Sequence, residues 1–314
     1  MLKVGVVGVG GISGAHIPAW NDLSEVELVA LCDIRQERLD QYPDKRHYND
    51  FKEMLEKEEL DILDICLPTY LHADYAVMAM EKGINVICEK PISLKEEDIE
   101  RVYSTAKKNN VKFMIAQVLR FWPEYELLKE IFDTKKYGKL LSGTMTRLGC
   151  YPKWSWDGWM MDEKRSGLTP FDLHIHDLDF MVYAFGAPKK VAHQFRSKRP
   201  DQDFISVTYD FGDFSINSEA SWYATSYPFT AEFRFQFEDA LVSNENGKMM
   251  IYLRDGKIDL SAEAEGDTGD INLPKSDAYA NEIKYFLECV INNKEVKKVQ
   301  DHELLTVLKI LNSL

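Results

Sequence analysis

A glycine-rich segment near the start of the sequence constrains the fold most. Leu2–Val7 is a short apolar run that predicts a buried strand, and it leads directly into Gly8-Val-Gly-Gly-Ile-Ser-Gly14. Ala15-His-Ile17 then predicts the start of a helix. Glycines allow a tight turn and the close approach of a ligand, while the free amides and dipole of a helix N-terminus favour an anion. The segment predicts a pyrophosphate site for a nicotinamide dinucleotide, with a plain glycine-rich turn as the alternative.

The segment departs from the G-x-G-x-x-G pattern at Ser13, because Gly14 comes one residue late. Serine is small and can cap a helix, so close helix–strand packing is expected to survive. A second predicted strand, Val26–Cys32, ends at Asp33, about 20 residues past the loop, where an acid binds the adenosine ribose. This order of strand, loop, helix, strand and acid favours a dinucleotide site.

Asp33 also favours NAD over NADP as the cofactor. The 2′-phosphate of NADP would face this carboxylate, and two like charges about 4 Å apart cost about 4 kcal/mol near a protein surface. Arg35 follows closely and softens the penalty. Use of NADP is therefore expected to be reduced rather than excluded.

Length and composition indicate a globular protein with two domains. A chain of 314 residues is longer than a single hydrophobic core ordinarily supports. Its content of 45% hydrophobic and 29% charged residues is typical of globular proteins. No run approaches the roughly 18 apolar residues of a membrane span. The first predicted strand begins almost at once, so no signal peptide is expected.

Charge and cysteine content narrow the partners and the compartment. The formal net charge of −14 argues against nucleic acid and anionic membranes as partners. Five scattered cysteines without a C-x-x-C pair favour reduced thiols in the cytoplasm.

Residues 1–118 alternate apolar strands with amphipathic helices and predict an α/β domain with a doubly wound parallel sheet. The strands are nearly continuous apolar runs, as in a sheet covered on both faces, and ligands should bind at their carboxyl ends. The predicted strands are Lys3–Val7, Val26–Cys32, Ile62–Leu67, Asn85–Cys88 and Lys112–Ala116. The predicted helices include Phe51–Lys57, His72–Lys82 and Glu96–Asn109.

The pattern changes near residue 118, and residues 119–314 predict an α+β domain with a largely antiparallel sheet. Arg120-Phe-Trp-Pro-Glu-Tyr125 begins a helix with Pro123 in its first turn. Alternation over Phe229–Phe237 places three phenylalanines on one face, in the core or a subunit interface. The predicted strands are Leu140–Arg147, Ile205–Phe211, Phe214–Trp222, Thr230–Phe237 and Met249–Leu253. A hairpin turn at Asp210–Asp213, an exposed loop at Glu263–Asp270 and closing helices at Asp277–Asn292 and Asp301–Ser313 complete the prediction.

Two further strand ends carry unusual side chains. Leu67-Pro-Thr-Tyr-Leu-His72 joins a strand to a helix, and Cys88-Glu-Lys-Pro-Ile-Ser93 follows another strand. Lys90 precedes a proline, which pushes its backbone into an extended conformation. A lysine fixed at a strand end can point at the ligand crevice, whereas an ordinary solvated lysine is the alternative.

The segment Ser166–Asp179 holds a second cluster of reactive side chains. Pro170 and the apolar spacing after it predict a helix, on which Asp172 and His176 share a face. His174 lies roughly opposite, at about 200°. A carboxylate that orients an imidazole is a general-base arrangement. Two alternatives stay open: a metal site built from these three residues, and a capping aspartate with two structural histidines.

Four aromatic residues lie just upstream of this cluster: Tyr151, Trp154, Trp156 and Trp159. Interleaved with polar residues, they fit a loop over a cleft better than a core strand. Aromatic faces pack against the C–H faces of a sugar or cyclitol, and polar neighbours take its hydroxyls.

These motifs together resemble the Gfo/Idh/MocA family (glucose–fructose oxidoreductase, inositol dehydrogenase and rhizopine-catabolism proteins) over essentially the whole chain. The specific part is Glu89-Lys-Pro91 after a strand, combined with Asp172-x-x-x-His176-Asp177. The other marks are Gly8–His16, Leu67–His72 and Arg120–Tyr125. The resemblance implies a Rossmann domain, then a domain with an open sheet whose outer face pairs subunits, and a Lys90–Pro91 bond that is often cis.

The resemblance also implies roles for the site residues. Lys90 would be the catalytic lysine, Asp172 its partner and His176 the acid/base. The expected reaction is hydride transfer between NAD and a secondary alcohol of a sugar or cyclitol, with His176 taking the hydroxyl proton and Lys90 stabilising the alkoxide. The residues expected to contact the cofactor are Gly8, Gly10, Gly11, Ile12, Ser13, Asp33, Arg35, Leu67, Thr69, His72, Glu89, Lys90 and Gln117. The residues expected to contact the substrate are Lys90, Arg120, Trp122, Tyr151, Trp154, Trp156, Asp172, His174 and His176.

Three residues depart from the pattern of the family. Ser13 replaces a glycine, Tyr70 stands where many relatives carry asparagine, and His174 stands where many carry glycine. Two other classes remain open, namely a cofactor-binding sensor that has lost catalysis and a metal-dependent hydrolase built on the Asp172, His174 and His176 cluster. The expected assembly is a homodimer or homotetramer formed through the sheet of the second domain, without a bound metal.

Overall fold

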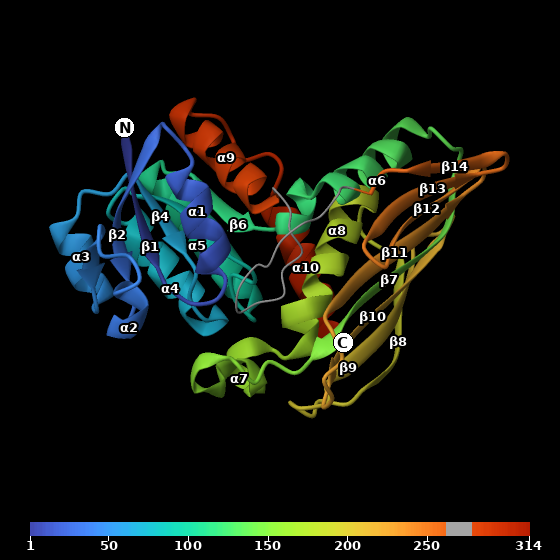
Figure 1. Cartoon of the computed structure of the whole chain (residues 1–314), viewed down its shortest axis with the longest axis horizontal. Coiled ribbons are helices and arrows are strands. Elements are labelled where there is room, and N and C mark those ends of the chain that lie inside the picture. The colour runs from blue at the N-terminus through green and yellow to red at the C-terminus, as the bar shows by residue number, and fades with distance from the viewer. Residues whose placement is uncertain (262–277) are drawn as a thin grey trace. The chain divides into compact units, whose positions relative to one another are not determined.

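The computed structural model of the chain describes residues 1–261 and 278–314, without the side chains of residues 194 and 195 (Figure 1). The predicted loop Glu263–Asp270 lies outside these residues. Contacts between residues divide the chain into two units. The first is Met1–Val118 together with a C-terminal segment that contains α9 (Ala278–Ile291). The second begins at Leu119 and includes Thr306–Leu314. None of the described helices is long and apolar enough to span a membrane.

The position of α9 differs from the predicted division at residue 118. The sequence assigned everything after that point to the second domain, whereas α9 packs against α1 (Ser13–Asn21) of the first unit. The reason is the apolar stripe of α9, where Ile283, Phe286 and Leu287 are buried. Helical spacing in the sequence predicts such a stripe but does not say which domain it covers.

The first unit is built on a sheet of six parallel strands in the order β3-β2-β1-β4-β5-β6. Its strands are β1 (Leu2–Val7), β2 (Val26–Cys32), β3 (Arg46–Tyr48), β4 (Ile62–Ile65), β5 (Asn85–Glu89) and β6 (Phe113–Ala116). Its helices before the domain boundary are α1, α2 (Gln36–Leu39), α3 (Phe51–Lys57), α4 (Thr69–Met80) and α5 (Glu96–Asn109). The prediction of a doubly wound parallel sheet is confirmed; α2 and β3 were not predicted, because both are short and mostly polar.

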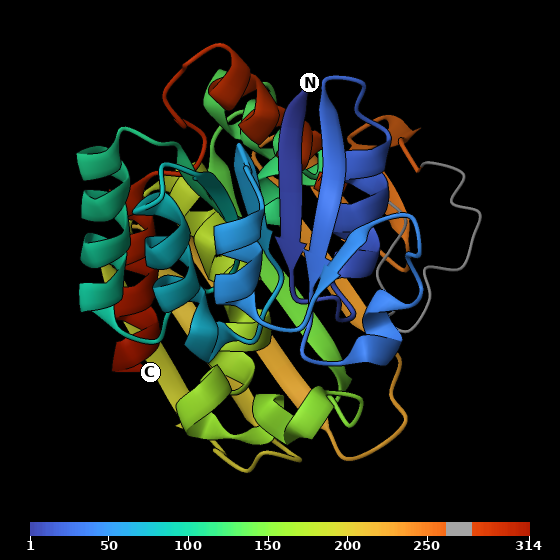
Figure 2. The same cartoon turned by 90° about the vertical axis from the view of Figure 1, so that its left-hand side faces the viewer.

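The strand order reverses between β1 and β4, and this reversal determines where a ligand can bind. The chain moves from β1 toward β3 through α1 and from β4 toward β6 through α4 and α5. Right-handed crossovers in opposite directions place these helices on opposite faces of the sheet. Figure 2 shows α3, α4 and α5 side by side, and α3 and α4 stack through Phe51 and Tyr75. The carboxyl ends of β1 and β4 therefore open a crevice at the point of reversal.

The second unit is built on an eight-stranded sheet in the order β14-β13-β12-β11-β7-β10-β9-β8. Among its described residues, all strand pairs are antiparallel except β7 with β10. The strands are β7 (Leu140–Cys150), β8 (Lys190–Arg196), β9 (Phe204–Asp210), β10 (Ser215–Tyr223), β11 (Thr230–Phe237), β12 (Ala240–Glu245), β13 (Lys248–Leu253) and β14 (Gly256–Asp259). The mostly antiparallel sheet and the hairpin turn between β9 and β10 are confirmed.

The core of the second unit lies between this sheet and its helices. Those helices are the 3₁₀ helix η1 (Val118–Phe121), α6 (Pro123–Thr134), the 3₁₀ helix η2 (Trp156–Met161), α7 (Glu163–Ser166), the π-helical segment η3 (Pro170–His174) and α8 (Ile175–Phe185), with part of α10 (Asp301–Ser313). Phe233, Phe235 and Phe237 are buried on the inner face of β11, as the alternation predicted. Tyr125 on α6 packs edge-on against Phe233 and against Phe180 on α8. The phenylalanine stripe is thus core.

Candidate functional site

The glycine loop follows β1 at the point where the strand order reverses. Gly8 has a φ of 91°, and a Cβ there would lie 2.5 Å from the carbonyl oxygen of Cys66, which follows β4. Only glycine fits this close approach of two strand ends. At Gly10, by contrast, no heavy atom lies within 4 Å of the position a Cβ would take. The loop is therefore closed against the sheet at Gly8 and open at Gly10, which fits the pyrophosphate of a dinucleotide.

Ser13 does not cap α1, contrary to the prediction. It is the first residue of the helix, its hydroxyl donates to the carbonyl oxygen of Gly10 at 2.8 Å, and Ile12 occupies the N-cap position without a side-chain cap. The serine is buried and holds the loop in its turn. The first turn also lacks an acidic residue, so no local carboxylate competes for the positive end of the helix.

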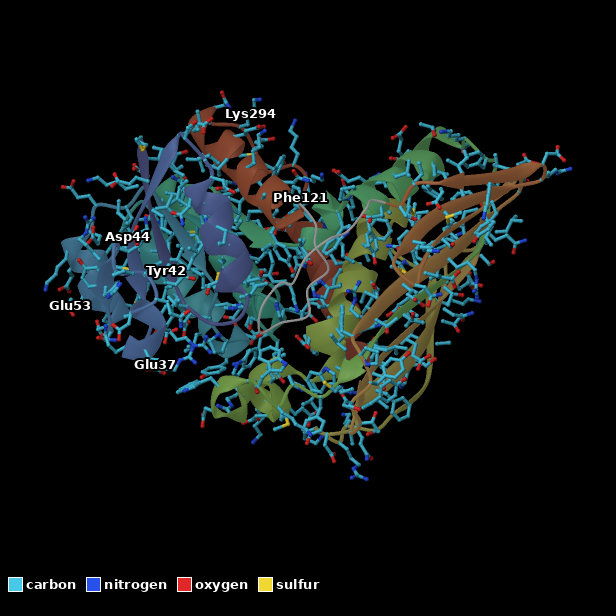
Figure 3. The ribbon with its side chains drawn as sticks, in the orientation of Figure 1. Glu37, Tyr42, Asp44, Glu53, Phe121 and Lys294 are labelled. Carbon is cyan, nitrogen blue, oxygen red and sulfur yellow. The ribbon has the colours of Figure 1, made fainter. Side chains whose placement is uncertain are left out.

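Asp33, at the end of β2, is tied to the loop and to Arg35. One carboxylate oxygen accepts the Val9 N–H at 2.8 Å, and the other accepts the backbone N–H of Arg35 at 2.8 Å. The Arg35 guanidinium lies on the same carboxylate at 3.2 Å. Asp33 thus orients the glycine loop, and its guanidinium partner partly offsets its charge. Glu37 lies in the first turn of the next helix, α2 (Figure 3).

Lys90 directly follows β5, and the bond from Lys90 to Pro91 is cis, as the resemblance implied. The backbone N–H of Lys90 donates to the Glu89 carboxylate at 3.1 Å. His72 on α4 is buried and places its two ring nitrogens 2.7 Å from the Pro91 carbonyl oxygen and 2.6 Å from that of Leu67. Burial lowers the pKa of His72, although the two carbonyls oppose this. The His72 ring therefore connects the end of β4 to Glu89-Lys90-Pro91, the lysine corner at the end of β5.

Behind this corner lies a buried polar cluster that the sequence analysis did not identify. His16 on α1 contacts Asp64 of β4 through Nδ1 at 2.9 Å and Glu89 through Nε2 at 3.1 Å. The indole N–H of Trp20 donates to Asp64 at 2.7 Å. One signal was available: Asp64 interrupts the apolar run Ile62-Leu-Asp-Ile65, and a charge in a buried strand needs partners.

In the second unit, Asp172 lies in the π-helical segment η3 and His176 in the first turn of α8. The predicted helix is confirmed, except that its first turn is widened; π-helical turns occur frequently at functional sites. Asp172 and His176 are half-buried, whereas His174 is fully buried. The burial pattern thus separates the two faces in the way that helical spacing predicted.

His174 and Arg120 have partners inside the second unit. His174 Nε2 lies 2.6 Å from the Tyr209 hydroxyl, and its Nδ1 lies 3.4 Å from the Ser218 hydroxyl. Burial, with a smaller effect of Arg147, lowers the pKa of His174 to about 3, so the ring is neutral. Arg120, 0% exposed, forms a bidentate ion pair with Asp179 at 2.7 and 2.8 Å. These contacts give both residues a structural role, where direct substrate contact was expected.

The segment before Asp172 is held by Asp203, which the sequence analysis also missed. The buried Asp203 carboxylate accepts the Thr169 N–H at 3.0 Å, and its backbone carbonyl accepts the Thr169 hydroxyl at 3.0 Å. Leu168, just before, has a φ of 59°, which costs a non-glycine residue about 1–3 kcal/mol. The strained backbone persists because Leu168 packs with Met160 and Trp222.

The four upstream aromatics divide into two pairs. Tyr151 and Trp159 pack against the cluster of Met160, Leu168 and Trp222. Trp154 and Trp156 are 56% and 42% exposed, respectively. Trp154 and Trp156 therefore present exposed aromatic surface of the kind against which the C–H face of a sugar packs. Trp122, also expected at the substrate, is half-buried at the N-cap of α6.

Among the residues that the structure describes, the donor atoms of Asp172, His174 and His176 do not converge as metal ligands would. The group that does converge is His16, Asp64 and Cys66, with donor atoms within 4.8 Å of one another. Its atoms already bond to one another, to Trp20 and to Glu89. The metal-dependent hydrolase is not supported by this geometry.

The remaining predicted cofactor contacts lie along the carboxyl edge of the first sheet. Leu67 and Thr69 lie between β4 and α4, with Thr69 buried at the first turn of α4. Gln117 follows β6 and is 2% exposed. The structure thus collects the predicted contacts of the first unit at strand ends β1, β2, β4, β5 and β6.

The comparisons with known proteins agree with this architecture. Residues 2–117 match the Gfo/Idh/MocA family model described as an oxidoreductase family with an NAD-binding Rossmann fold, and residues 125–242 match the C-terminal domain of the same family. The chain belongs to the Gfo/Idh/MocA family, and its first unit is an NAD-binding Rossmann domain.

Individual relatives are more distant. The chain is 34% identical to an inositol 2-dehydrogenase of Salmonella typhimurium over 147 residues, which is 45% of this chain and 44% of the relative. It is 28% identical to a 2,7-anhydro-N-acetylneuraminate hydratase of Mediterraneibacter gnavus over 172 residues, 52% of this chain and 46% of the relative. The chain thus spans about half the length of these curated relatives. Its fold is similar to that of a myo-inositol 2-dehydrogenase from Lactobacillus plantarum, with a TM-score of 0.82 and 21% identity over 99% of this chain and 95% of the other.

Proposed function

We propose that the chain is an NAD-dependent dehydrogenase that acts on a secondary alcohol of a sugar or cyclitol. The observation that carries the proposal is the Glu89-Lys90-Pro91 corner at the end of β5, on a Rossmann sheet whose glycine loop is open at Gly10. Relatives named for inositol and other sugar substrates support the substrate class.

Lys90 and His176 would divide the work on the alcohol. His176, oriented by Asp172, accepts the hydroxyl proton as general base. The Lys90 ammonium stabilises the negative charge that develops on the substrate oxygen. NAD, when bound, supplies the acceptor for the hydride. Trp154 and Trp156 offer aromatic faces to the C–H surface of the ring.

NAD is the proposed cofactor in preference to NADP. Asp33 follows β2, where the acid of a dinucleotide site meets the ribose, and the Arg35 guanidinium is held on Asp33. If Arg35 swings away from Asp33, it can meet a 2′-phosphate, which leaves some use of NADP. The variant Asp33→Ser should therefore bind NADPH more tightly relative to NADH, as measured by titration; an unchanged ratio would count against this role for Asp33.

We further propose that the outer face of the eight-stranded sheet pairs two copies of the chain. Leu141 of β7 and Tyr252 of β13 are 43% and 42% exposed on it. Light scattering of the wild type and of the double variant Leu141→Glu, Tyr252→Glu tests this assembly. A monomeric wild type would exclude it.

The activity is tested by incubating the protein with NAD and a panel of cyclitols, aldoses and glycosides, and following NADH absorbance. Turnover with at least one polyol, lowered by about 10²–10³ in Lys90→Met, supports the proposal. If NADH stabilises the protein but no alcohol is oxidised and no ketone is reduced, the alternative of a cofactor-binding sensor is favoured. Retention of Lys90, Asp172 and His176 argues against that alternative.

A further inference from the structure

The cluster around His16 is fully built into the first unit, and the proposed reaction does not use it. His16 and Asp64 are 0% exposed and Glu89 is 8% exposed. The three residues come from α1, β4 and β5, so the cluster joins the helix of the glycine loop to the strand that ends at Lys90.

The geometry of the ring determines its charge. Each ring nitrogen of His16 faces a carboxylate oxygen, Asp64 at 2.9 Å and Glu89 at 3.1 Å. An ionised carboxylate only accepts hydrogen bonds, so both nitrogens must donate, and only the imidazolium has two N–H groups. Burial alone would favour the neutral ring, but the Asp64 carboxylate outweighs it and raises the pKa of His16 well above its usual value.

The cluster also contacts the backbone of the proposed catalytic lysine. The Glu89 oxygen that does not face His16 accepts the Lys90 N–H at 3.1 Å. Asp64, at the other end, is held by the Trp20 indole at 2.7 Å and by the Cys66 thiol at 3.6 Å. A continuous chain of hydrogen bonds thus runs from Asp64 through His16 and Glu89 to the amide of Lys90.

We propose that His16 is a positioning residue for Lys90. As an imidazolium it donates to the buried Glu89 carboxylate and orients it, and Glu89 in turn fixes the Lys90 backbone at the end of β5. The catalytic consequence rests on the proposed function, whereas the charge state of His16 does not. Because α1 begins at the glycine loop, the same ring links the pyrophosphate site to the lysine corner.

Other titratable groups face the cluster and belong to the argument. The Cys66 thiol follows β4, and burial raises its pKa to about 12, so the thiol stays neutral. Cys88 lies next to Glu89 on β5, and burial raises its pKa well above the usual value. Helix α9, packed on α1, brings the Tyr279 ring to a centroid distance of 5.8 Å from His16 and carries the buried Glu282. Among these described groups, His16 supplies the positive charge between the two carboxylates.

The first experiment measures the charge of His16 directly in the intact protein. Histidine labelled with ¹⁵N is incorporated, and the ring nitrogen signals are followed from about pH 6 to about pH 9, which spans the usual range of histidine titration. We expect both nitrogens of His16 to remain protonated throughout, and Asp64→Asn to make the ring lose a proton within this range. The exposed His302 on α10 supplies the reference signal of a solvent-accessible ring. A wild-type His16 that is neutral at pH 7 would overturn the proposal.

The second experiment tests whether His16 acts through Glu89, by a double-mutant cycle on turnover. His16→Gln should lower kcat between about tenfold and about a hundredfold, as misplacement of a catalytic group does, while NADH affinity stays within about twofold. In a Glu89→Gln background the same substitution should cost little more, because the carboxylate that His16 holds is gone. His302→Gln is the matched control. Additive losses, or a kcat unchanged in His16→Gln, would overturn the positioning role. If the wild type turns over no alcohol, the proposed function fails, and the labelled-histidine result still decides the charge state.

Discussion

His16 in the first unit and His174 in the second are both 0% exposed, yet their surroundings differ in kind. His16 lies between the carboxylates of Asp64 and Glu89, which can only accept hydrogen bonds. His174 lies between the hydroxyls of Tyr209 and Ser218, which can donate or accept. Carboxylate partners therefore hold a cation, and hydroxyl partners hold a neutral ring.

The two histidines also neighbour different residues of the proposed reaction. His16 connects through Glu89 to Lys90, whose positive charge is proposed to act on the substrate oxygen. His174 is two residues from both Asp172 and His176, on the opposite face of the same helical segment. Burial of a histidine thus says little about its charge until its partners are known. The following predictions test whether the two regions differ in this way.

The largest expected effect comes from removing a proposed catalytic group in either unit. Lys90→Met and His176→Asn should each lower kcat by about 10²–10³, because each removes a group that acts on charge or proton in the transition state. Steady-state kinetics and NADH titration measure this. Lys82→Met, an exposed lysine after α4, is the control. If kcat falls in only one of the two variants, the unit that carries the other residue takes no part in the chemical step.

The next effect is an opposite pH dependence of stability for the two buried histidines. For His174 the folded pKa of about 3 lies below the unfolded value of about 6.5, so the unfolded state binds the extra proton. The free energy of unfolding should fall as pH falls through this window, by up to about 1.4 kcal/mol per pH unit. For His16 the folded pKa is raised, so its stabilisation is fully present below about pH 6.5 and is lost as pH rises through the folded pKa.

Denaturant unfolding across pH, with His174→Gln and His16→Gln beside the wild type, distinguishes the two signs. The difference in unfolding free energy between wild type and His174→Gln should shrink toward low pH. The difference between wild type and His16→Gln should shrink toward high pH. Two differences that change in the same direction would show that the rings carry the same charge.

A smaller effect is expected from the hydroxyl partners of His174. Tyr209→Phe removes a hydrogen bond of 2.6 Å and leaves a buried ring nitrogen unsatisfied, which should cost about 1–3 kcal/mol of unfolding free energy. Ser218→Ala removes the longer contact of 3.4 Å and should cost less, about 0.5–1.5 kcal/mol. Tyr227→Phe, at an exposed tyrosine after β10, is the control for the loss of a tyrosine hydroxyl. An equal loss for Tyr209→Phe and Tyr227→Phe would remove the assigned partner of His174.

Most of the fold could be predicted from the sequence because apolar periodicity decides it locally. The strand Val26–Cys32 and the helices Phe51–Lys57 and Glu96–Asn109 have the predicted bounds, since continuous or periodic apolar residues mark them. The strand Arg46–Tyr48 was missed because its three residues are polar or aromatic and carry no such pattern. Placement of α9 depended on a packing partner more than 250 residues away, which periodicity does not encode.

The candidate site was predictable where chemistry and strand ends coincide along the chain. Gly8, Asp33 and Lys90 each directly follow an apolar strand, so their positions at one edge of the sheet followed from topology. His16 was not predictable in the same way, because Asp64 and Glu89 lie 48 and 73 residues away from it. Arg120 and His174 looked like pocket residues by type, but partners distant in sequence, Asp179 and Tyr209, hold them in the core.

Hydride transfer is the central claim, and a deuterium-transfer experiment tests it most directly, because one relative is named as a hydratase. An alcohol that gives turnover is supplied with deuterium on its carbinol carbons, together with NAD, and the reduced nicotinamide is analysed by mass spectrometry and NMR. The account predicts deuterium on the nicotinamide ring in the wild type, and the same labelling at a rate about 10²–10³ lower in Lys90→Met. Deuterium that appears in solvent while substrate is converted and the nicotinamide stays unlabelled would contradict it.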